Sequence, residues 1–424
     1  MFKFITNIIS EVNNRQTEKI FRILNFSIPV FMGIYLFANP LPLSAVNEFC
    51  FYLSVAALIL LLVFRKTAFT LRSPLTLPIA LFFLWSVFGL FFTLDFKNTL
   101  HDLRGHLLEY LIVFYLLVNY YNSQKKLEII SWLVIASATI FSIGAIIQYY
   151  FIEGFPFSAR LGLTFRGSMP TDLIGFITTF SSILALHLFH KNKSVTYKIL
   201  FIACFLLTTA ATLLTQSRGS LIGLGASFII LCFANKRNLI FVVLAALLIF
   251  LTPGMSDRIK SEGFTKDIRA KINQLTIEVI KDHPIAGIGF GMQIYGNKNV
   301  LDLEKLNKQL PPEYQQNGAI IAAPHNTILD IAVRTGIVGL ALFLYILITS
   351  LWMLWKTLNL KKDEYFRSWA ICLFACFVSY MIPALFADTT FGPMVIIFYT
   401  MLAMITILWN LVQKDKNEHA VKSH

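Results

Sequence analysis

The sequence predicts an all-α polytopic membrane protein with about 12 transmembrane helices. Hydrophobic residues make up 56% of the 424-residue chain and charged residues only 14%, whereas soluble domains carry about 25% charged residues. The apolar residues also gather in runs of the roughly 17–25 residues that cross a bilayer. Helices are expected because lipid offers backbone groups no other partner, and the runs are too continuous for barrel strands.

Taken in order, the chain begins with a basic, mildly amphipathic segment, 1–22, which is expected at the cytoplasmic membrane surface. Residues 23–252 are expected to hold nine spans, 253–326 one large loop with amphipathic helices, 327–412 three spans, and 413–424 a cytoplasmic tail. The apolar runs predict spans at about 23–40, 48–64, 75–94, 107–122, 129–151, 171–189, 196–214, 219–235, 238–252, 327–355, 367–386 and 391–412.

Lys and Arg indicate the orientation. With the N-terminus inside, every inside segment contains basic residues, as cytoplasmic loops do. The net charge of +13 fits this bias, so no nucleic-acid partner is expected. The five cysteines lie in or beside apolar runs without a CxxC pair, which argues against disulfides or a thiolate metal site. A few basic residues in short outer connections break the charge rule: Lys97, Arg104, Arg160, Arg166, Arg218 and Arg334.

Arg218 follows Thr-Gln-Ser between two apolar runs and precedes Gly219. It could be an anchor that snorkels to the surface, or it could pair with a buried carboxylate. Because an arginine at membrane depth usually serves function, we favour a binding role. Its guanidinium matches phosphate oxygens in a bidentate way.

The long polar segment from Pro253 to Gly336 is expected to carry half of a site at the membrane surface. Apolar residues at spacings of four, three and four (Ile268, Ile272, Leu275 and Val279) predict an amphipathic helix that Pro284 limits. Arg269 borders its apolar face and could either bind a lipid headgroup or be a solvated helix charge. Gly287, Gly289 and Gly291 predict a turn back toward the membrane.

His325 stands in Pro-His-Asn, directly before an apolar run. It could be an interfacial polar residue, but histidine is the side chain suited to proton transfer near neutral pH. We therefore favour His325 as a general base, which Asn326 or Asp330 could orient.

Asp388 lies between the last two spans and could either orient His325 or hold an arginine. Arg160 and Arg166, in another outer loop, could extend an anion site or bind lipid headgroups. No carboxylate cluster resembles a metal-binding motif, and His101 and His106 lack helical metal-pair spacing. We predict neither metal nor cofactor.

Together these residues resemble the O-antigen ligase/O-antigen polymerase superfamily of bacterial membrane glycosyltransferases. The resemblance covers the chain from about the sixth span onward. Its parts are Thr-Gln-Ser-Arg-Gly at Arg218, Arg269 before Asp-His-Pro-Ile-Ala-Gly-Ile-Gly, Pro-His-Asn-Thr-Ile-Leu at His325, and the closing Thr-Gly-Ile-Val-Gly-Leu from Thr335.

The resemblance implies a GT-C-like fold in the bacterial inner membrane, with the active site facing the periplasm. It implies a glycan donor on undecaprenyl pyrophosphate and, in ligases, a lipid A–core acceptor. By position, Arg218 and Arg269 would bind the pyrophosphate and His325 would activate the acceptor. Asp388 matches an acidic position, with Asn326, Arg160 and Arg166 as supporting residues.

Three other functions remain open. A polymerase or a protein O-oligosaccharyltransferase of the same superfamily would differ in its acceptor. Polymerases more often have two sizeable outer loops, so the single long loop favours a ligase. A transporter of the lipid-linked glycan would place polar groups at mid-membrane and show internal repeats, whereas here the polar groups gather at one face.

Overall fold

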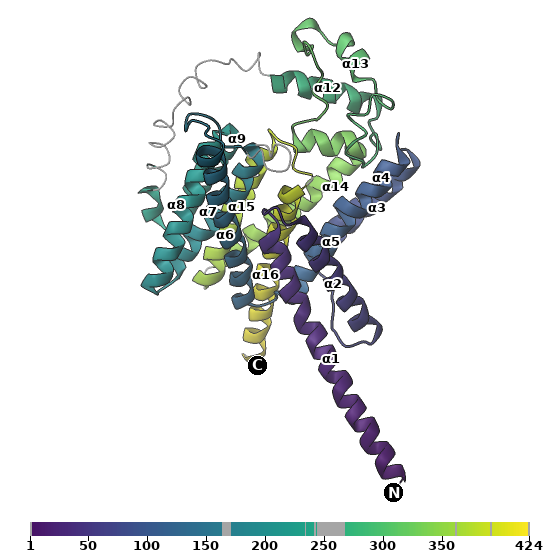
Figure 1. Ribbon diagram of the computed structural model, residues 1–424, viewed down its shortest axis with the longest axis vertical. Coiled ribbons are helices and arrows are strands. Elements are labelled where there is room, and N and C mark those ends of the chain that lie inside the picture. The colour runs from purple at the N-terminus through teal and green to yellow at the C-terminus, as the bar shows by residue number, and fades with distance from the viewer. Residues whose placement is uncertain are drawn as a thin grey trace.

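The computed structural model describes residues 2–162, 171–233, 235–240, 243, 268–360, 363–390 and 392–422, and every regular element in these ranges is a helix (Figure 1). The helices are α1 (Phe2–Ala38), α2 (Ser44–Val63), α3 (Thr76–Phe88), α4 (Phe96–Asp102), α5 (Glu109–Tyr120), α6 (Gln124–Ile146), α7 (Thr171–Lys191), α8 (Val195–Thr215), α9 (Arg218–Cys232), α12 (Ile268–Asp282), α13 (Leu303–Gln309), α14 (Thr327–Leu358), α15 (Glu364–Ala384) and α16 (Gly392–Lys422).

Eight of the described helices are long and apolar enough to cross a membrane. The prediction of an all-α polytopic membrane protein is therefore confirmed. Three further predicted spans fall on the shorter helices α3, α5 and α9. The predicted ninth span, about 238–252, lies almost entirely outside the described residues, so the number of twelve stays a prediction.

The helices form a bundle with a buried centre and an apolar outer surface. Most of α7 and α16 is buried, whereas α1 and α2 are largely exposed. The exposed residues of these outer helices include Phe26 and Phe49. Large apolar side chains on the outside of such a bundle belong in lipid, because the bilayer core solvates them.

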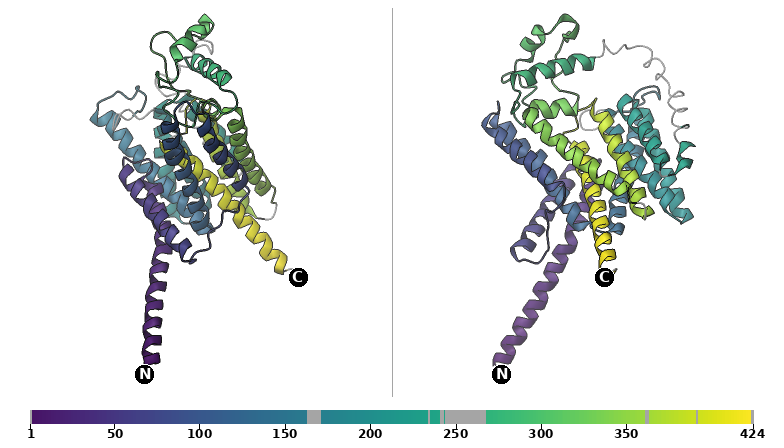
Figure 2. Two further views of the ribbon diagram at one scale, coloured as in Figure 1. Left: turned by 90° about the vertical axis from the view of Figure 1, so that its right-hand side faces the viewer. Right: turned by 180° about the vertical axis from the view of Figure 1, so that it is seen from behind.

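The two ends of the bundle differ in what they carry (Figures 1 and 2). The N-terminal end of α1 and the C-terminal end of α16 lie at one end, and α12 and α13 lie at the other. Helix α1 is continuous, so one helix covers both the predicted interfacial segment and the first predicted span. The predicted long loop thus stands at the end of the bundle opposite both termini.

Helix α12 confirms the amphipathic pattern read from its sequence. Leu275 and Val279 are fully buried, while Ile268 at the first turn is 44% exposed. The helix ends at Asp282, two residues before Pro284, as expected for a residue that cannot continue a helix. Its apolar face packs in a small separate core that includes Val333 of α14.

Helix α14 is broken at Gly336, which differs from the predicted continuous span of 327–355. Gly336 has φ +71° and ψ −177°, a conformation that is essentially restricted to glycine. At the break, the amide of Ile337 donates to the carbonyl of Pro284 at 2.8 Å, and Ile288 donates to Val333 at 2.9 Å. A short first helix, 327–335, therefore holds the turn that follows α12, and the long apolar part begins after Gly336.

Candidate active site

Asp172 joins three separate segments at the end of the bundle that carries α12. Its carboxylate lies 3.8 Å from Nη2 of Arg269 and 4.0 Å from Nη2 of Arg160. It also accepts a hydrogen bond from the hydroxyl of Ser217 at 2.6 Å. Asp172 is in the first turn of α7, where the helix dipole favours a negative charge. The carboxylate thus gathers residues of α12, the α6–α7 loop and the α8–α9 turn around one point.

The α8–α9 turn is tightly tied to the loop that carries Arg160. Gln216 ends α8 with φ +50°, and its side-chain amide donates to the carbonyl of Ser158 at 3.0 Å. The guanidinium of Arg160 donates to the carbonyl of Thr215 at 3.2 Å and to the hydroxyl of Thr171 at 2.8 Å. These bonds explain why the chain needs the irregular Thr-Gln-Ser turn between two helices.

Arg218 is the first residue of α9 and follows Ser217, the residue bonded to Asp172. The structure therefore brings the backbone of Arg218 to the same end of the bundle as Arg160 and Arg269. Arg166, the other arginine predicted for the α6–α7 loop, lies outside the described residues.

Arg269 enters the site from the long loop, one residue into α12. Its guanidinium carbon lies 5.8 Å from the ring centre of Phe386, in the α15–α16 connection. The ion pair with Asp172 is long compared with the 2.7–2.9 Å of a close charged hydrogen bond. Arg269 therefore lies between the bundle and the loop, next to the Asp172 carboxylate but beyond the distance of a close hydrogen bond to it.

His325 lies beside these charges in a strained backbone conformation. Its φ is +45°, which is uncommon for a residue other than glycine and often marks functional sites. Burial, followed by the positive charge of Arg269, lowers the pKa of His325 below its ordinary value, while Asp172 raises it in part. The half-buried imidazole is thus held in its neutral form, which can accept a proton.

Asn326 caps the helix that follows His325. Its side-chain oxygen accepts from the backbone N–H groups of Ile328 at 3.0 Å and Leu329 at 3.2 Å. Asn326 was expected to be able to orient the His325 side chain. Its side-chain oxygen instead accepts hydrogen bonds from the backbone at the start of α14. The cap fixes the backbone immediately after His325.

Asp388 belongs to a buried network next to the arginine site. The hydroxyl of Thr390 lies 2.9 Å from Oδ1 of Asp388 and 2.7 Å from Oδ2 of Asp330. It accepts a hydrogen bond from Nη1 of Arg334 at 2.8 Å. Of the two roles predicted for Asp388, the structure favours the one with an arginine, and that arginine is Arg334.

Arg334 is the centre of this network. It is 2% exposed, its Nη1 lies 3.3 Å from Asp330 Oδ2, and its Nε donates to the carbonyl of Phe290 at 2.8 Å. Burial, and then the neighbouring Asp330 carboxylate, raise the pKa of Asp388 to about 7, although Arg334 lowers it. One guanidinium therefore faces two carboxylates, and Asp388 holds a proton over part of the neutral pH range.

Asp330 and Asp172 are the residues whose roles the sequence reasoning missed or misassigned. Asp330 pairs with Arg334 one helical turn away, a spacing at which side chains meet, rather than serving His325. Asp172 falls within the predicted span 171–189, and no role was predicted for it from the sequence. Its position directly after Pro170-Thr171 nevertheless indicates the start of a helix. A carboxylate at the outer end of a span would have been a usable signal.

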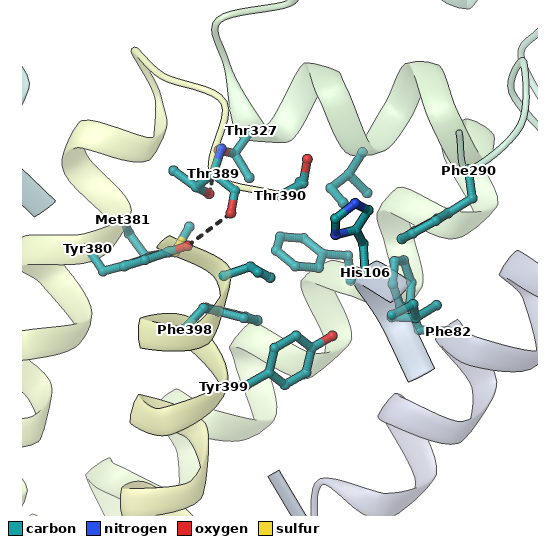
Figure 3. A pocket seen from close by; sticks show the side chains of 14 residues that line it. Phe82, His106, Phe290, Thr327, Tyr380, Met381, Thr389, Thr390, Phe398 and Tyr399 are labelled. Carbon is teal, nitrogen blue, oxygen red and sulfur yellow. Dashed lines mark hydrogen bonds between the residues drawn. The ribbon is translucent and has the colours of Figure 1, made fainter. Parts of the chain in front are cut away.

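A small apolar pocket lies under the first part of α14 (Figure 3). Phe290, Phe398 and Tyr399 line it together with His106, and Thr390 of the buried network stands at its edge. Its volume of about 30 Å³ is enough for only a few water molecules. The pocket is therefore too small for a lipid chain or a sugar and is a feature of the packed support beneath the site.

The arrangement suits the binding of an anion and the acceptance of a proton. Arg160 and Arg269 meet at Asp172, Arg218 begins α9 at the same end of the bundle, and the imidazole of His325 lies near the charges of Arg269 and Asp172. Guanidinium groups bind phosphate oxygens in a bidentate way. No group of three or more His, Cys, Asp or Glu side chains suited to a metal occurs in the part of the chain that the structure describes.

Comparison with known families links these residues to one class of protein. Residues 202–344 match a family model described as O-Antigen ligase. The match begins within α8 and ends in α14, so it includes Arg218, Arg269 and His325. A search of curated proteins finds no match.

Proposed function

We propose, from the premise that the chain belongs to the O-antigen ligase superfamily, that it is the ligase itself. In this proposal it transfers an O-antigen glycan from undecaprenyl pyrophosphate to a sugar hydroxyl of lipid A–core. The enzyme would act in the bacterial inner membrane, with the site facing the periplasm. The observation that carries the proposal is the meeting of Arg269, Arg160 and the α8–α9 turn at Asp172, beside His325.

The reaction needs few components, and the site residues match them. The acceptor hydroxyl attacks the anomeric carbon as the bond from that carbon to the pyrophosphate oxygen breaks. The pyrophosphate leaves with the electron pair, and Arg218 and Arg269 stabilise its charge. The proton of the hydroxyl passes to the neutral imidazole of His325. A single displacement of this kind inverts the anomeric centre and requires neither a nucleotide nor a metal.

The supporting residues have positioning roles in this proposal. Asp172 holds Arg160 and Arg269 in place before the donor arrives. The Asp330–Arg334–Asp388 network fixes the short first helix of α14, and so the backbone at His325. Arg166 is a further candidate for the anion site, on the strength of its sequence position alone.

A polymerase and a protein O-oligosaccharyltransferase remain the alternatives, because they use the same donor and differ in the acceptor. The single long polar segment between the ninth and tenth predicted spans favours the ligase. A transporter is disfavoured because Arg160, Arg269 and Asp172 meet at one end of the bundle, not at mid-membrane, and lie beside a histidine suited to proton transfer.

The test is a transfer reaction with purified protein, lipid-linked donor and lipid A–core acceptor, with EDTA present and no nucleotide. We expect His325→Ala to lower the transfer rate by about 10²–10⁴-fold and to leave donor affinity nearly unchanged, because the arginines hold the pyrophosphate. His283→Ala is the matched control, since His283 lies in the same loop at the end of α12.

The other possible results of this assay would each contradict a different part of the proposal. Lengthening of the donor glycan would indicate a polymerase, and absence of product with the native protein would favour a transporter. Substantial product from His325→Ala would remove His325 as the base and make His283 the next candidate. Loss of native activity in EDTA would contradict the metal-independent mechanism.

A further inference from the structure

A second polar cavity lies at the opposite end of the bundle from Asp172. It forms where α7 and α9 end and α15 begins, and its volume is about 480 Å³, within the range of small-ligand sites. On α7, the lining residues His187 and Lys191 come 15 and 19 residues after Asp172, which is about 22–29 Å at 1.5 Å per residue. The cavity is therefore distinct from the candidate active site. Its polar lining residues are His187, His190, Lys191, Lys193, Asn235, Asn238, Glu364, Tyr365 and Ser368.

His187 gives this cavity an unsatisfied polar atom. The side chain is 7% exposed, yet its buried Nε2 has no hydrogen-bond partner among the described residues. The neighbouring ring of Trp369 packs against His187 at 4.5 Å between ring centres and does not supply that partner. Leaving such a group unpaired costs about 1–3 kcal/mol. An unpaired, buried Nε2 that lines a cavity indicates a polar occupant.

The rest of the lining is held rigidly and is rich in donors. Nε2 of His190 lies 2.6 Å from the side-chain oxygen of Asn238, which fixes that ring. The ammonium of Lys191 pairs with Glu128 and lies 4.1 Å from the ring centre of Tyr365. Lys193 is exposed at the rim, as is the carboxylate of Glu364.

The chemistry of these groups selects the class of ligand. The ammonium of Lys193, the ammonium of Lys191 beside Glu128, and the imidazole of His187 are suited to a ligand with several acceptor oxygens, and the Glu364 carboxylate at the rim is the one group that disfavours an anion. Phosphate is such a ligand, and basic pockets between spans at the cytoplasmic surface bind the headgroups of anionic lipids. By the distribution of Lys and Arg, this end of the bundle is the cytoplasmic one.

We propose that this cavity is a binding site for a phosphate group, supplied by an anionic phospholipid or by a soluble phosphorylated molecule. The site lies on the other face of the membrane from the proposed transfer chemistry. The proposal therefore stands whether or not the protein is a ligase, and its test does not use glycan transfer.

The experiment is native mass spectrometry of the full-length protein purified in an uncharged detergent. The probes are phosphatidylglycerol, diacylglycerol of the same acyl chains, which lacks the phosphate, and inorganic phosphate as competitor. Ser368→Phe fills the cavity from α15, and Lys193→Met removes a rim charge. Lys125→Met is the matched control, because Lys125 is an exposed lysine at the same end of the bundle but outside the cavity.

We expect the native protein to retain phosphatidylglycerol at least tenfold more strongly than diacylglycerol. Ser368→Phe should abolish this preference, Lys193→Met should weaken it about fivefold, and Lys125→Met should leave it unchanged. Displacement by inorganic phosphate at millimolar concentration would assign the site to a soluble phosphate. Equal retention of the two lipids without phosphate binding would overturn the proposal, as would native behaviour of both Ser368→Phe and Lys193→Met.

Discussion

At the residue scale, Asp172 explains how residues far apart in the sequence form one site. A carboxylate between two guanidinium groups offsets their mutual repulsion. Because both ion pairs are about 4 Å long, a phosphate can replace the carboxylate as the closer partner. In the proposed reaction, Asp172 would therefore organise the arginines without competing strongly with the donor pyrophosphate.

The arginines should not tolerate lysine equally. Arg218→Lys and Arg269→Lys should each lower kcat/KM for transfer by about 10–100-fold, because a point charge cannot replace a bidentate fork. Arg160→Lys should lower kcat/KM less, because Arg160 is a supporting residue whose guanidinium donates a hydrogen bond to the backbone carbonyl of Thr215. Initial rates with purified, membrane-inserted protein measure this. Transfer at the native rate by Arg218→Ala would exclude the pyrophosphate role.

The pH dependence of transfer should report the environment of His325. Only the neutral imidazole accepts a proton, so kcat/KM should rise with pH and level off above the pKa of His325. Because burial and Arg269 lower that pKa, the midpoint should lie below about 6.5, the ordinary value for histidine.

Replacing Asp172 should move the pKa of His325 in a known direction. Asp172 raises the pKa of His325, so Asp172→Asn should move the acid midpoint further down. The same change should also lower kcat/KM about tenfold at the plateau, because the arginines lose an organising partner. An upward movement of the midpoint would show that His325 is not the group that titrates.

At the element scale, the break in α14 connects the long loop to the bundle. A Cβ at Gly336 would overlap the backbone of Ile285, and a Cβ at Gly287 would meet the carbonyl of Val333 at 2.5 Å. Two glycines with positive φ thus allow two backbone segments to touch. The close approach holds α12, and with it Arg269, at a fixed height above the bundle.

Gly336→Ala should therefore destabilise the protein by about 3 kcal/mol, because backbone strain of 1–3 kcal/mol is joined by a steric overlap. Thermal unfolding of the purified protein in detergent measures the change. Gly225→Ala in α9 is the matched control, since no atom lies within 4 Å of its added Cβ and alanine favours helix. Equal melting temperatures for the two variants would contradict the role of the break.

At the scale of the whole molecule, the two ends of the bundle carry different chemistry. The arginines, His325 and the long loop lie at one end, and a rim of lysines and histidines lies at the other. Such a division suits an enzyme that meets its lipid-linked substrate at one face of a membrane.

Cysteine labelling of intact cells tests which face is which. Single cysteines in 297–318 should react with a membrane-impermeant reagent, and cysteines in 191–198 should react only after lysis. The native cysteines are replaced beforehand, although all but Cys232 are buried. The reverse pattern would place the site in the cytoplasm and exclude a periplasmic ligase.

The sequence by itself determined the class of protein, the position of the described spans and the amphipathic face of α12. These features are local, because the length and spacing of apolar runs predict which segments enter the membrane and which helix faces are buried. It also indicated that His325, Arg218 and Arg269 are candidate functional residues, since ionisable groups near the membrane are energetically costly and usually bind a partner or take part in function.

Only the tertiary structure decided which of these residues meet. Asp172 receives Arg160, Arg269 and Ser217, and Asp388 shares Thr390 with Asp330 and Arg334. It also showed that α14 breaks at Gly336, which the apolar pattern does not reveal. The reason is that periodicity fixes the faces of each helix, whereas partners distant in sequence depend on how helices pack and on how far the connecting loops reach.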